Sequence, residues 1–359
     1  MTTTAPTDRE RTIPFVAGDG LPCNLIHAQG ERTPTRGPVL LVHGAGVRAN
    51  IFRAPVERTL VDELLDDGWD VWLENWRASV DLAPNRWTLD QAALFDHPVA
   101  VQTVLRETGA STLSAIIHCQ GSTSFMMSAV AGLVPEVTHI ISNAVSLHPV
   151  VPFAAGIKLR VAVPTLRPLT DYIDCQWGVE SPTLLSKALT AFVKLTHREC
   201  DNIVCRYASF TYGVGFPTLW RHENLNDETH EWLTHEFGAV PLTFFNQIGR
   251  SVRAGHLISV EGRPELPGNF VAQPPRTEAR LSFFAGEQNR CFLAESQRRT
   301  YEYFHRLRPG FHSLHILPDY GHLDVFMGKN AARDVFPLML TELNRTPSQQ
   351  ATSPSALPD

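Results

Sequence analysis

Residues 112–130 constrain the fold of this chain more than any other stretch. Residues 113–118 are apolar or β-branched in most positions, which is typical of a buried strand. A short turn of small and polar residues begins at Cys119, and residues 122–130 are compatible with an apolar helix. A strand, a sharp turn and a helix in this order are typical of a nucleophile elbow. The pattern therefore predicts that Cys119 lies above a sheet edge, with its backbone at a helix N-terminus.

Other segments repeat the alternation of strand and helix on both sides of this elbow. Apolar runs of strand length are residues 38–46, 70–77, 137–145, 279–290 and 312–318, and a hairpin is expected over residues 13–27. Segments of helical character are residues 55–67, 89–108 and 331–343. Continuous apolar strands are typical of a parallel sheet that is covered on both faces. The order of elements predicts an α/β fold.

The elbow resembles that of the α/β-hydrolase superfamily. Its sequence resembles the elbow motif of the acid lipases, which is Gly-His-Ser-Gln-Gly. His118, Gln120 and Gly121 match this motif, Cys119 replaces the serine, and Ile117 replaces the first glycine. The resemblance implies an α/β-hydrolase fold, a mostly parallel sheet flanked by helices, with an inserted and mainly helical cap.

The resemblance also assigns roles to residues in the loops that follow the strands. It implies a catalytic triad in the chain order of this fold, formed by Cys119, Asn289 and His322. It implies that backbone N–H groups form an oxyanion hole, supported by a strand-to-loop turn and the elbow glycine. The oxyanion-hole residues are Ala45 and Gln120, and the supporting residues are His43, Gly44 and Gly121.

A cysteine nucleophile changes what the triad requires. A helix N-terminus and a nearby imidazolium both lower the pKa of a thiol, so we expect Cys119 to form a thiolate–imidazolium pair with His322. A neutral Asn289 can then orient the imidazole, as in papain-like sites. Asp324 is an alternative partner for His322, although its position in the family suggests that it stabilises the loop.

Two neighbours of Cys119 have structural interpretations. Ser122 is an alternative nucleophile, but it lies in the first helical turn, where serine is typical of a cap. In the family, the residue corresponding to His118 faces away from the site, so we expect His118 to be structural.

The chain divides into a core and an insertion. We expect residues 1–146 and 275–345 to form the hydrolase core and residues 147–274 to form the cap, because the stretch between the flanking strands is too long for a loop. Residues 1–12 are expected to be a loose tail, and residues 346–359, rich in Ser, Pro and Gln, a disordered one.

Composition excludes several other classes of protein. The net charge of −6 over 359 residues and the lack of a basic cluster argue against nucleic-acid binding. We find no secretory signal and no apolar run of membrane-spanning length, so a cytoplasmic location is expected. The six cysteines lack zinc-finger spacing. Cys200 and Cys205 could pair or bind a metal, but with no nearby set of His or Cys partners we interpret them as buried thiols. We expect neither a metal nor a cofactor.

The combined pattern predicts a hydrolase of ester or thioester bonds in an apolar, lipid-like substrate, acting through an acyl-enzyme on Cys119. Acyl transfer remains open, as does the oligomeric state, and a peripheral contact with lipid is expected through the cap. The core also resembles hydrolase-like domains associated with bacterial cholesterol-oxidase-type flavoproteins. Two alternatives remain: a dienelactone-hydrolase-like lactone hydrolase, and a catalytically silent ligand-binding or interaction protein, for which Ile117 and Asn289 argue.

Overall fold

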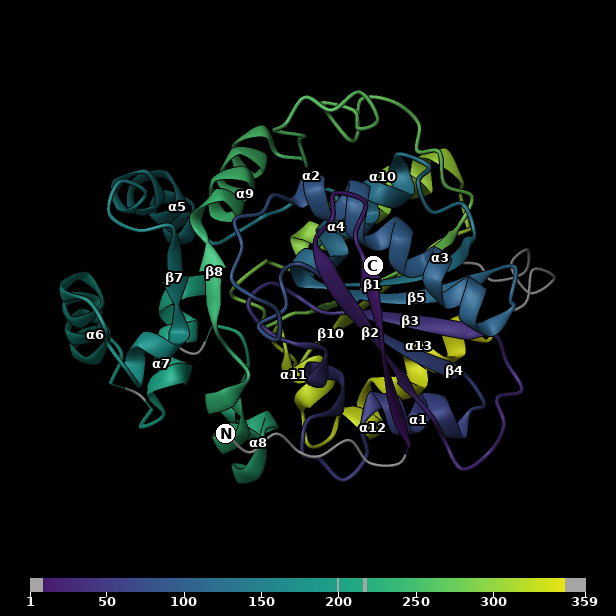
Figure 1. The fold of residues 1–359 in the computed structure, drawn as a ribbon, viewed down its shortest axis with the longest axis horizontal. Coiled ribbons are helices and arrows are strands. Elements are labelled where there is room, and N and C mark those ends of the chain that lie inside the picture. The colour runs from purple at the N-terminus through teal and green to yellow at the C-terminus, as the bar shows by residue number, and fades with distance from the viewer. Residues whose placement is uncertain (1–8, 199, 216–217, 346–359) are drawn as a thin grey trace, which may run out of the picture.

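A computed structural model describes residues 9–198, 200–215 and 218–345 of the chain. Its main sheet has eight strands in the order β1-β2-β4-β3-β5-β6-β9-β10 (Figure 1). These strands are β1 (Glu10–Val16), β2 (Pro22–Ala28), β3 (Pro38–Val42), β4 (Asp70–Asn75), β5 (Leu113–His118), β6 (Val137–Asn143), β9 (Arg280–Gly286) and β10 (Ser313–Leu317). β1 and β2 pair antiparallel, β2 pairs antiparallel with β4, and every later pairing is parallel. The predicted α/β-hydrolase fold is confirmed.

Helices cover both faces of this sheet. α3, α4 and α10 lie above it in the view of Figure 1, α1 and α12 lie below it, and α13 overlaps the strands near β4 in this view. The bounds are α1 (Leu60–Asp66), α2 (Leu89–Gln91), α3 (His97–Thr108), α4 (Cys119–Val130), α10 (Glu295–Leu307), α11 (Asp324–Met327), α12 (Ala331–Asp334) and α13 (Phe336–Leu343). Because both faces are covered, every residue of β3, β5 and β9 is buried, which explains why apolar residues predominate in these strands.

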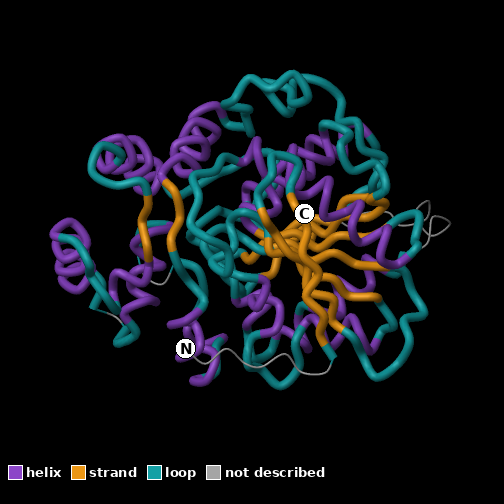
Figure 2. The backbone as a smooth tube through the Cα atoms, viewed as in Figure 1, coloured by secondary structure: helices purple, strands orange, loops and turns teal. Residues whose placement is uncertain are grey.

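Between β6 and β9 the chain leaves the main sheet, and this excursion contains the predicted cap. It consists of α5 (Phe153–Leu166), α6 (Leu184–Thr196), α7 (Ile203–Tyr212), α8 (Asp227–Trp232), α9 (Leu242–Ala254) and the antiparallel pair β7 (Tyr172–Asp174) and β8 (Ala239–Pro241). Short 3-10 turns complete it: η3 (Cys175–Gly178), η4 (His222–Asn224) and η5 (Leu233–His235). Figure 2 shows its two strands apart from the fan of the main sheet.

Several predicted boundaries were wrong. The first helix begins at Leu60, because Thr59 and Asp62 form a capping box there. The segment 89–108 is helical, but its middle, Ala92–Asp96, is a π-helix. The closing helix is divided at Val335, directly before α13, which has a proline in its first turn.

The predicted tails have different outcomes. Glu10 and the two residues after it belong to β1, not to a loose tail. The predicted disordered tail 346–359 lies outside the described residues. Among the described residues, no helix is long and apolar enough to cross a bilayer.

Candidate active site

Cys119 occupies the turn between β5 and α4 with a left-handed backbone, at φ 54°. Non-glycine residues adopt this region rarely, and such strain concentrates at functional sites. Gly121 is required beside it, because a Cβ there would lie 2.2 Å from the carbonyl oxygen of His43. Gly44 is similarly close, since its Cβ would lie 2.9 Å from the Cβ of Cys119. The sharp elbow forms even though Ile117, buried in β5 between β3 and β6, replaces the first glycine.

The two predicted oxyanion-hole residues flank the sulfur. The backbone N–H groups of Gln120 and Ala45 lie close enough to Cys119 Sγ to favour its thiolate form, because each lowers the pKa of the thiol. Tyr212, from α7, donates its hydroxyl to the carbonyl oxygen of Ala45 at 3.0 Å. This contact fixes the Ala45 peptide from outside the core, and sequence reasoning assigned no such role to Tyr212. His43 supports the loop from below, because its carbonyl accepts the indole N–H of Trp76 at 3.0 Å.

His322 and Asn289 meet in the loops after β10 and β9. Asn289 Nδ2 lies 2.9 Å from His322 Nδ1, and Asn289 Oδ1 accepts the backbone N–H groups of Cys291 and Phe292, each at 3.0 Å. A ring nitrogen of His322, a ring nitrogen of His118 and Cys119 Sγ lie within 4.8 Å of one another. The fold therefore brings all three predicted triad residues together.

Burial determines the charge state of this cluster. It raises the pKa of Cys119 to about 12, although the N–H groups of Gln120 and Ala45 act in the opposite direction. Burial also lowers the pKa of His322 to about 3. Both groups are therefore neutral near pH 7, and the predicted thiolate–imidazolium pair is not the resting state of this buried site. Desolvation of the two charges outweighs the helix N-terminus.

The resemblance to the family predicted that His118 faces away from the site, and this prediction was wrong. Its ring centroid lies 4.7 Å from that of His322, and its Nδ1 accepts the side-chain N–H of Asn143 at 2.9 Å. Burial and the neighbouring His322 lower its pKa well below the usual value. The site thus contains a second neutral imidazole, and the only signal in the sequence was its position directly before Cys119.

Asp324 and Ser122 have structural contacts. Asp324 accepts the backbone N–H of Gly321 at 2.9 Å and the side-chain N–H of Asn224 at 2.6 Å, so it stabilises the loop that carries His322. Ser122 Oγ lies 2.8 Å from Ser142 Oγ. Ser122 therefore bonds across to β6 and does not cap α4, which was the predicted role.

The space above Cys119 is small and mainly apolar. It has a volume of about 30 Å³, which is about the share of one liquid water molecule. Most of its lining comes from the cap and from the loop after β9: Val151, Ala155, Leu159, Phe244, Phe245, Ile248, Cys291 and Phe292. This volume is far too small for an acyl chain in the present arrangement of the cap.

Among the described residues that line this space, Lys158 is the one cation. Its Nζ donates to the carbonyl oxygens of Phe210 and Gly213, and burial lowers its pKa to about 8. Its isolation within an apolar stretch was a signal that sequence reasoning did not use.

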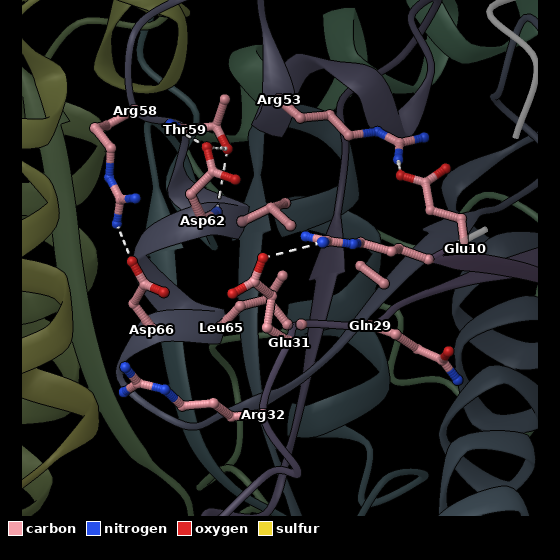
Figure 3. A pocket seen from close by; sticks show the side chains of 14 residues that line it. Glu10, Gln29, Glu31, Arg32, Arg53, Arg58, Thr59, Asp62, Leu65 and Asp66 are labelled. Atoms are coloured by element: carbon pink, nitrogen blue, oxygen red, sulfur yellow. Dashed lines mark hydrogen bonds and ion pairs between the residues drawn. The ribbon is translucent and has the colours of Figure 1, made fainter. Parts of the chain in front are cut away.

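A larger hollow of about 500 Å³ lies elsewhere, between α1 and the segment after β2 (Figure 3). Its charged side chains form ion pairs with one another, among them Arg53 with Glu10, Arg58 with Asp66, and Arg9 with Glu31. None of the predicted site residues lines it. Because its charges are paired and the predicted residues lie elsewhere, we do not interpret this hollow as the candidate active site.

The expectation that Cys200 and Cys205 have no histidine partners nearby was wrong. The donor atoms of His222 and His230 lie within 4.8 Å of both sulfurs and of each other. These histidines lie 22 and 30 residues after Cys200 in the sequence. At this spacing, the sequence alone did not indicate that they are neighbours of the two cysteines.

Proteins of similar sequence include lipases and a sterol esterase. Lipase member K of Homo sapiens is 30% identical over 338 residues, which cover 86% of this chain and 80% of that protein. Sterol esterase 2 of Saccharomyces cerevisiae is 27% identical over 157 residues, which span 36% of this chain and only 29% of the esterase. No family model matches the chain.

Solved structures share the fold at low identity. A soluble variant of monoglyceride lipase from Saccharomyces cerevisiae, in complex with a substrate analog, superposes with a TM-score of 0.57 and 18% identity, covering 98% of both chains. The open form of a lipase superposes with a TM-score of 0.59 and 14% identity, covering 94% of this chain and 100% of the other.

Proposed function

The chain belongs to the α/β-hydrolase superfamily, among the lipases and esterases that hydrolyse carboxylic ester bonds, and on this premise we propose that Cys119 is the nucleophile. The observation that carries the proposal is the Cys119 sulfur, held on a left-handed backbone and contacted by the N–H groups of Ala45 and Gln120. Those donors are positioned for an oxyanion that forms beside the sulfur.

The proposed reaction has two halves. Cys119 Sγ forms a bond to the carbonyl carbon of an ester or thioester, and its proton passes to His322 Nε2. The N–H groups of Ala45 and Gln120 hold the oxyanion until the leaving group departs with the proton from His322. His322 then takes a proton from water, the hydroxide attacks the thioacyl carbon, and the carboxylic acid is released as Cys119 regains its proton.

Asn289 limits the rate of the first half of the reaction, in which Cys119 transfers its proton to His322. His322 Nε2 can accept a proton only when the ring carries its hydrogen on Nδ1, and that tautomer needs an acceptor there. Asn289 offers Nδ1 an N–H, because its oxygen is bonded to two backbone N–H groups. The reactive tautomer is therefore a minor one, and we expect slow turnover.

The proposed substrate is an apolar acyl ester. The lining of the small space is mainly hydrocarbon and aromatic, and the names of two similar proteins, lipase member K and monoglyceride lipase, refer to lipid esters. Phe153 and Leu184 on the cap helices α5 and α6 are each 86% exposed, which would suit a peripheral contact with lipid. A catalytically silent ligand-binding protein is the second candidate, favoured by the N–H that Asn289 presents to His322.

A substrate panel and intact mass measurement test this proposal together. We expect the protein to hydrolyse p-nitrophenyl esters and acyl-CoA thioesters, with longer acyl chains favoured, and to accumulate one acyl group on the peptide that contains Cys119. Cys119→Ala should abolish both signals. The matched control is Cys23→Ala, a buried thiol in β2 outside the site, which should retain them. Binding of fatty acyl ligands without acylation or turnover would favour the silent protein.

A further inference from the structure

Four side chains converge in the cap, away from Cys119. Cys200 lies just before α7, Cys205 is in its first turn, His222 begins η4 and His230 is in α8. Cys200 Sγ lies 3.3 Å from His230 Nε2, and Cys205 Sγ lies 3.5 Å from His222 Nε2. All four donor atoms lie within 4.8 Å of one another.

These separations match the edges of a tetrahedron around a zinc ion. With Zn–S bonds of about 2.3 Å and Zn–N bonds of about 2.0–2.1 Å, a tetrahedral site places sulfur and nitrogen about 3.6 Å apart. Two thiolates and two imidazoles form a common structural zinc site, and tetrahedral S₂N₂ donors select zinc among the hard and soft divalent ions. We propose that Cys200, Cys205, His222 and His230 bind one zinc ion.

The surroundings suit two zinc-bound thiolates. The backbone N–H of Asn202 donates to Cys200 Sγ at 3.4 Å, and the buried indole N–H of Trp220, which has no hydrogen-bond partner, lies near enough to Cys205 to favour its thiolate. The side chain of Asn202 also donates to the carbonyl oxygen of His230 at 2.9 Å, which joins the two halves of the cluster. Such contacts orient metal ligands and stabilise their charge. A disulfide between the two cysteines would not account for the position of either histidine next to the sulfur atoms.

The four protein donors fill a tetrahedral shell, so the site has no open position for substrate and its role is structural. The ion would hold two segments that reach the core. α7 ends at Tyr212, which bonds to Ala45, and η4 contains Asn224, which bonds to Asp324 in the loop of His322. Zinc would thus fix the base of the cap against both sides of the candidate active site.

The experiment measures metal content in the full chain, purified from zinc-supplemented medium with any affinity tag removed. We expect one zinc per chain, with X-ray absorption giving two sulfur and two nitrogen neighbours at the distances above. Cys200→Ser and His230→Gln should each lose the zinc. Cys175→Ser is the matched control, because Cys175 is a buried thiol of the same cap outside the cluster, and it should retain the zinc.

A second comparison separates this site from the active site. His118, Cys119 and His322 are also close enough to hold a cation, so zinc content is measured in Cys119→Ala as well, where it should be unchanged. If a cysteine variant does not fold, the wild type answers the same question: a chelator should lower its melting temperature and added zinc should restore it. Zinc lost in Cys119→Ala but kept in Cys200→Ser would overturn the proposal. So would a wild type without zinc, or a peptide containing Cys200 and Cys205 that is lighter by two hydrogens.

Discussion

The side-chain amide of Asn289 donates to His322 Nδ1 across 2.9 Å, so the imidazole receives a hydrogen bond where a catalytic imidazole must give one. The orientation of the amide follows from its oxygen, which accepts the backbone N–H groups of Cys291 and Phe292. If the amide were rotated by about 180°, its NH₂ group would face the two backbone N–H groups, and none of these donors would have an acceptor. His322 therefore carries its hydrogen on Nε2, the atom needed as a base.

Asn289→Asp should raise kcat/KM for ester substrates by about 10²–10⁴-fold, because a carboxylate satisfies both sets of donors. One oxygen can accept the two backbone N–H groups while the other accepts the Nδ1 hydrogen of His322, which frees Nε2. Steady-state kinetics on p-nitrophenyl esters measure the gain. Asn289→Ala is the control, and it should show no gain because it removes the amide without adding an acceptor. An unchanged or lower kcat/KM in a folded Asn289→Asp protein would show that the tautomer of His322 does not limit turnover.

Cys119→Ser should be nearly inactive alone and regain activity when combined with Asn289→Asp. A serine hydroxyl is a weaker acid than a thiol, so it depends more on a base that is correctly oriented. We expect the loss from Cys119→Ser to be smaller in the Asn289→Asp background than in the wild type, a non-additivity that a double-mutant cycle measures. Equal losses in both backgrounds would argue that His322 does not activate residue 119.

Alkylation of Cys119 should accelerate steadily with pH. Burial raises the pKa of its thiol to about 12, so the thiolate fraction grows about tenfold for each pH unit from 7 to 10. The rate is measured by mass mapping of the iodoacetamide-labelled peptide, and Cys119→Ala identifies that peptide. A rate that is already constant below pH 7 would instead indicate the thiolate–imidazolium pair.

The sequence motifs predicted correctly which residues meet at the carboxyl edge of the sheet. Cys119 and Gly121 lie in one elbow, and His322 follows a strand with a Gly-His turn, so their meeting follows from the parallel sheet. The charge of the site could not be predicted in this way. The sequence suggested a helix N-terminus that lowers the pKa of Cys119, but burial under the cap outweighs it. The direction of the Asn289 amide depends on two backbone N–H groups, which no motif shows.

The contacts made by residues of the cap could not be predicted from the sequence either. Tyr212 reaches Ala45 from 167 positions away, and the residues that cover the site come from an insertion whose docking no periodicity reveals. The cluster around Cys200 draws its histidines from separate short elements, at a spacing wider than that of a zinc finger. Tertiary packing alone brings these groups together.

Tyr212→Phe should lower kcat by about 3- to 10-fold, which corresponds to one hydrogen bond of about 0.5–1.5 kcal/mol, while KM changes less. The ring stays in place, so the variant removes only the hydroxyl that holds the Ala45 carbonyl. The matched control is Tyr207→Phe on the same helix, whose hydroxyl contacts Thr190 and not the site. Equal effects of the two variants on kcat would show that the contact with Ala45 has no catalytic consequence.

Glu342 on α13 should make stability depend on pH. Burial alone would raise its pKa, but the hydrogen bond from His315 and the charge of Arg280 hold that pKa well below the usual range. The folded chain therefore prefers the ionised form. The stability this contributes is complete above the unfolded pKa of about 4.3 and is lost, by about 1.4 kcal/mol per pH unit, as pH falls toward the folded value.

Glu342→Gln should accordingly lower the free energy of unfolding by about 3–5 kcal/mol at pH 7, because Arg280 stays buried without its carboxylate partner. The difference from wild type should shrink at pH 3, and urea denaturation at both pH values measures it. Glu295→Gln, which removes an exposed ion pair with Arg299 on α10, is the control and should cost less than about 1 kcal/mol. A deficit of the same size at pH 3 and pH 7 would mean that Glu342 contributes through its shape and hydrogen bonds, and not through its charge.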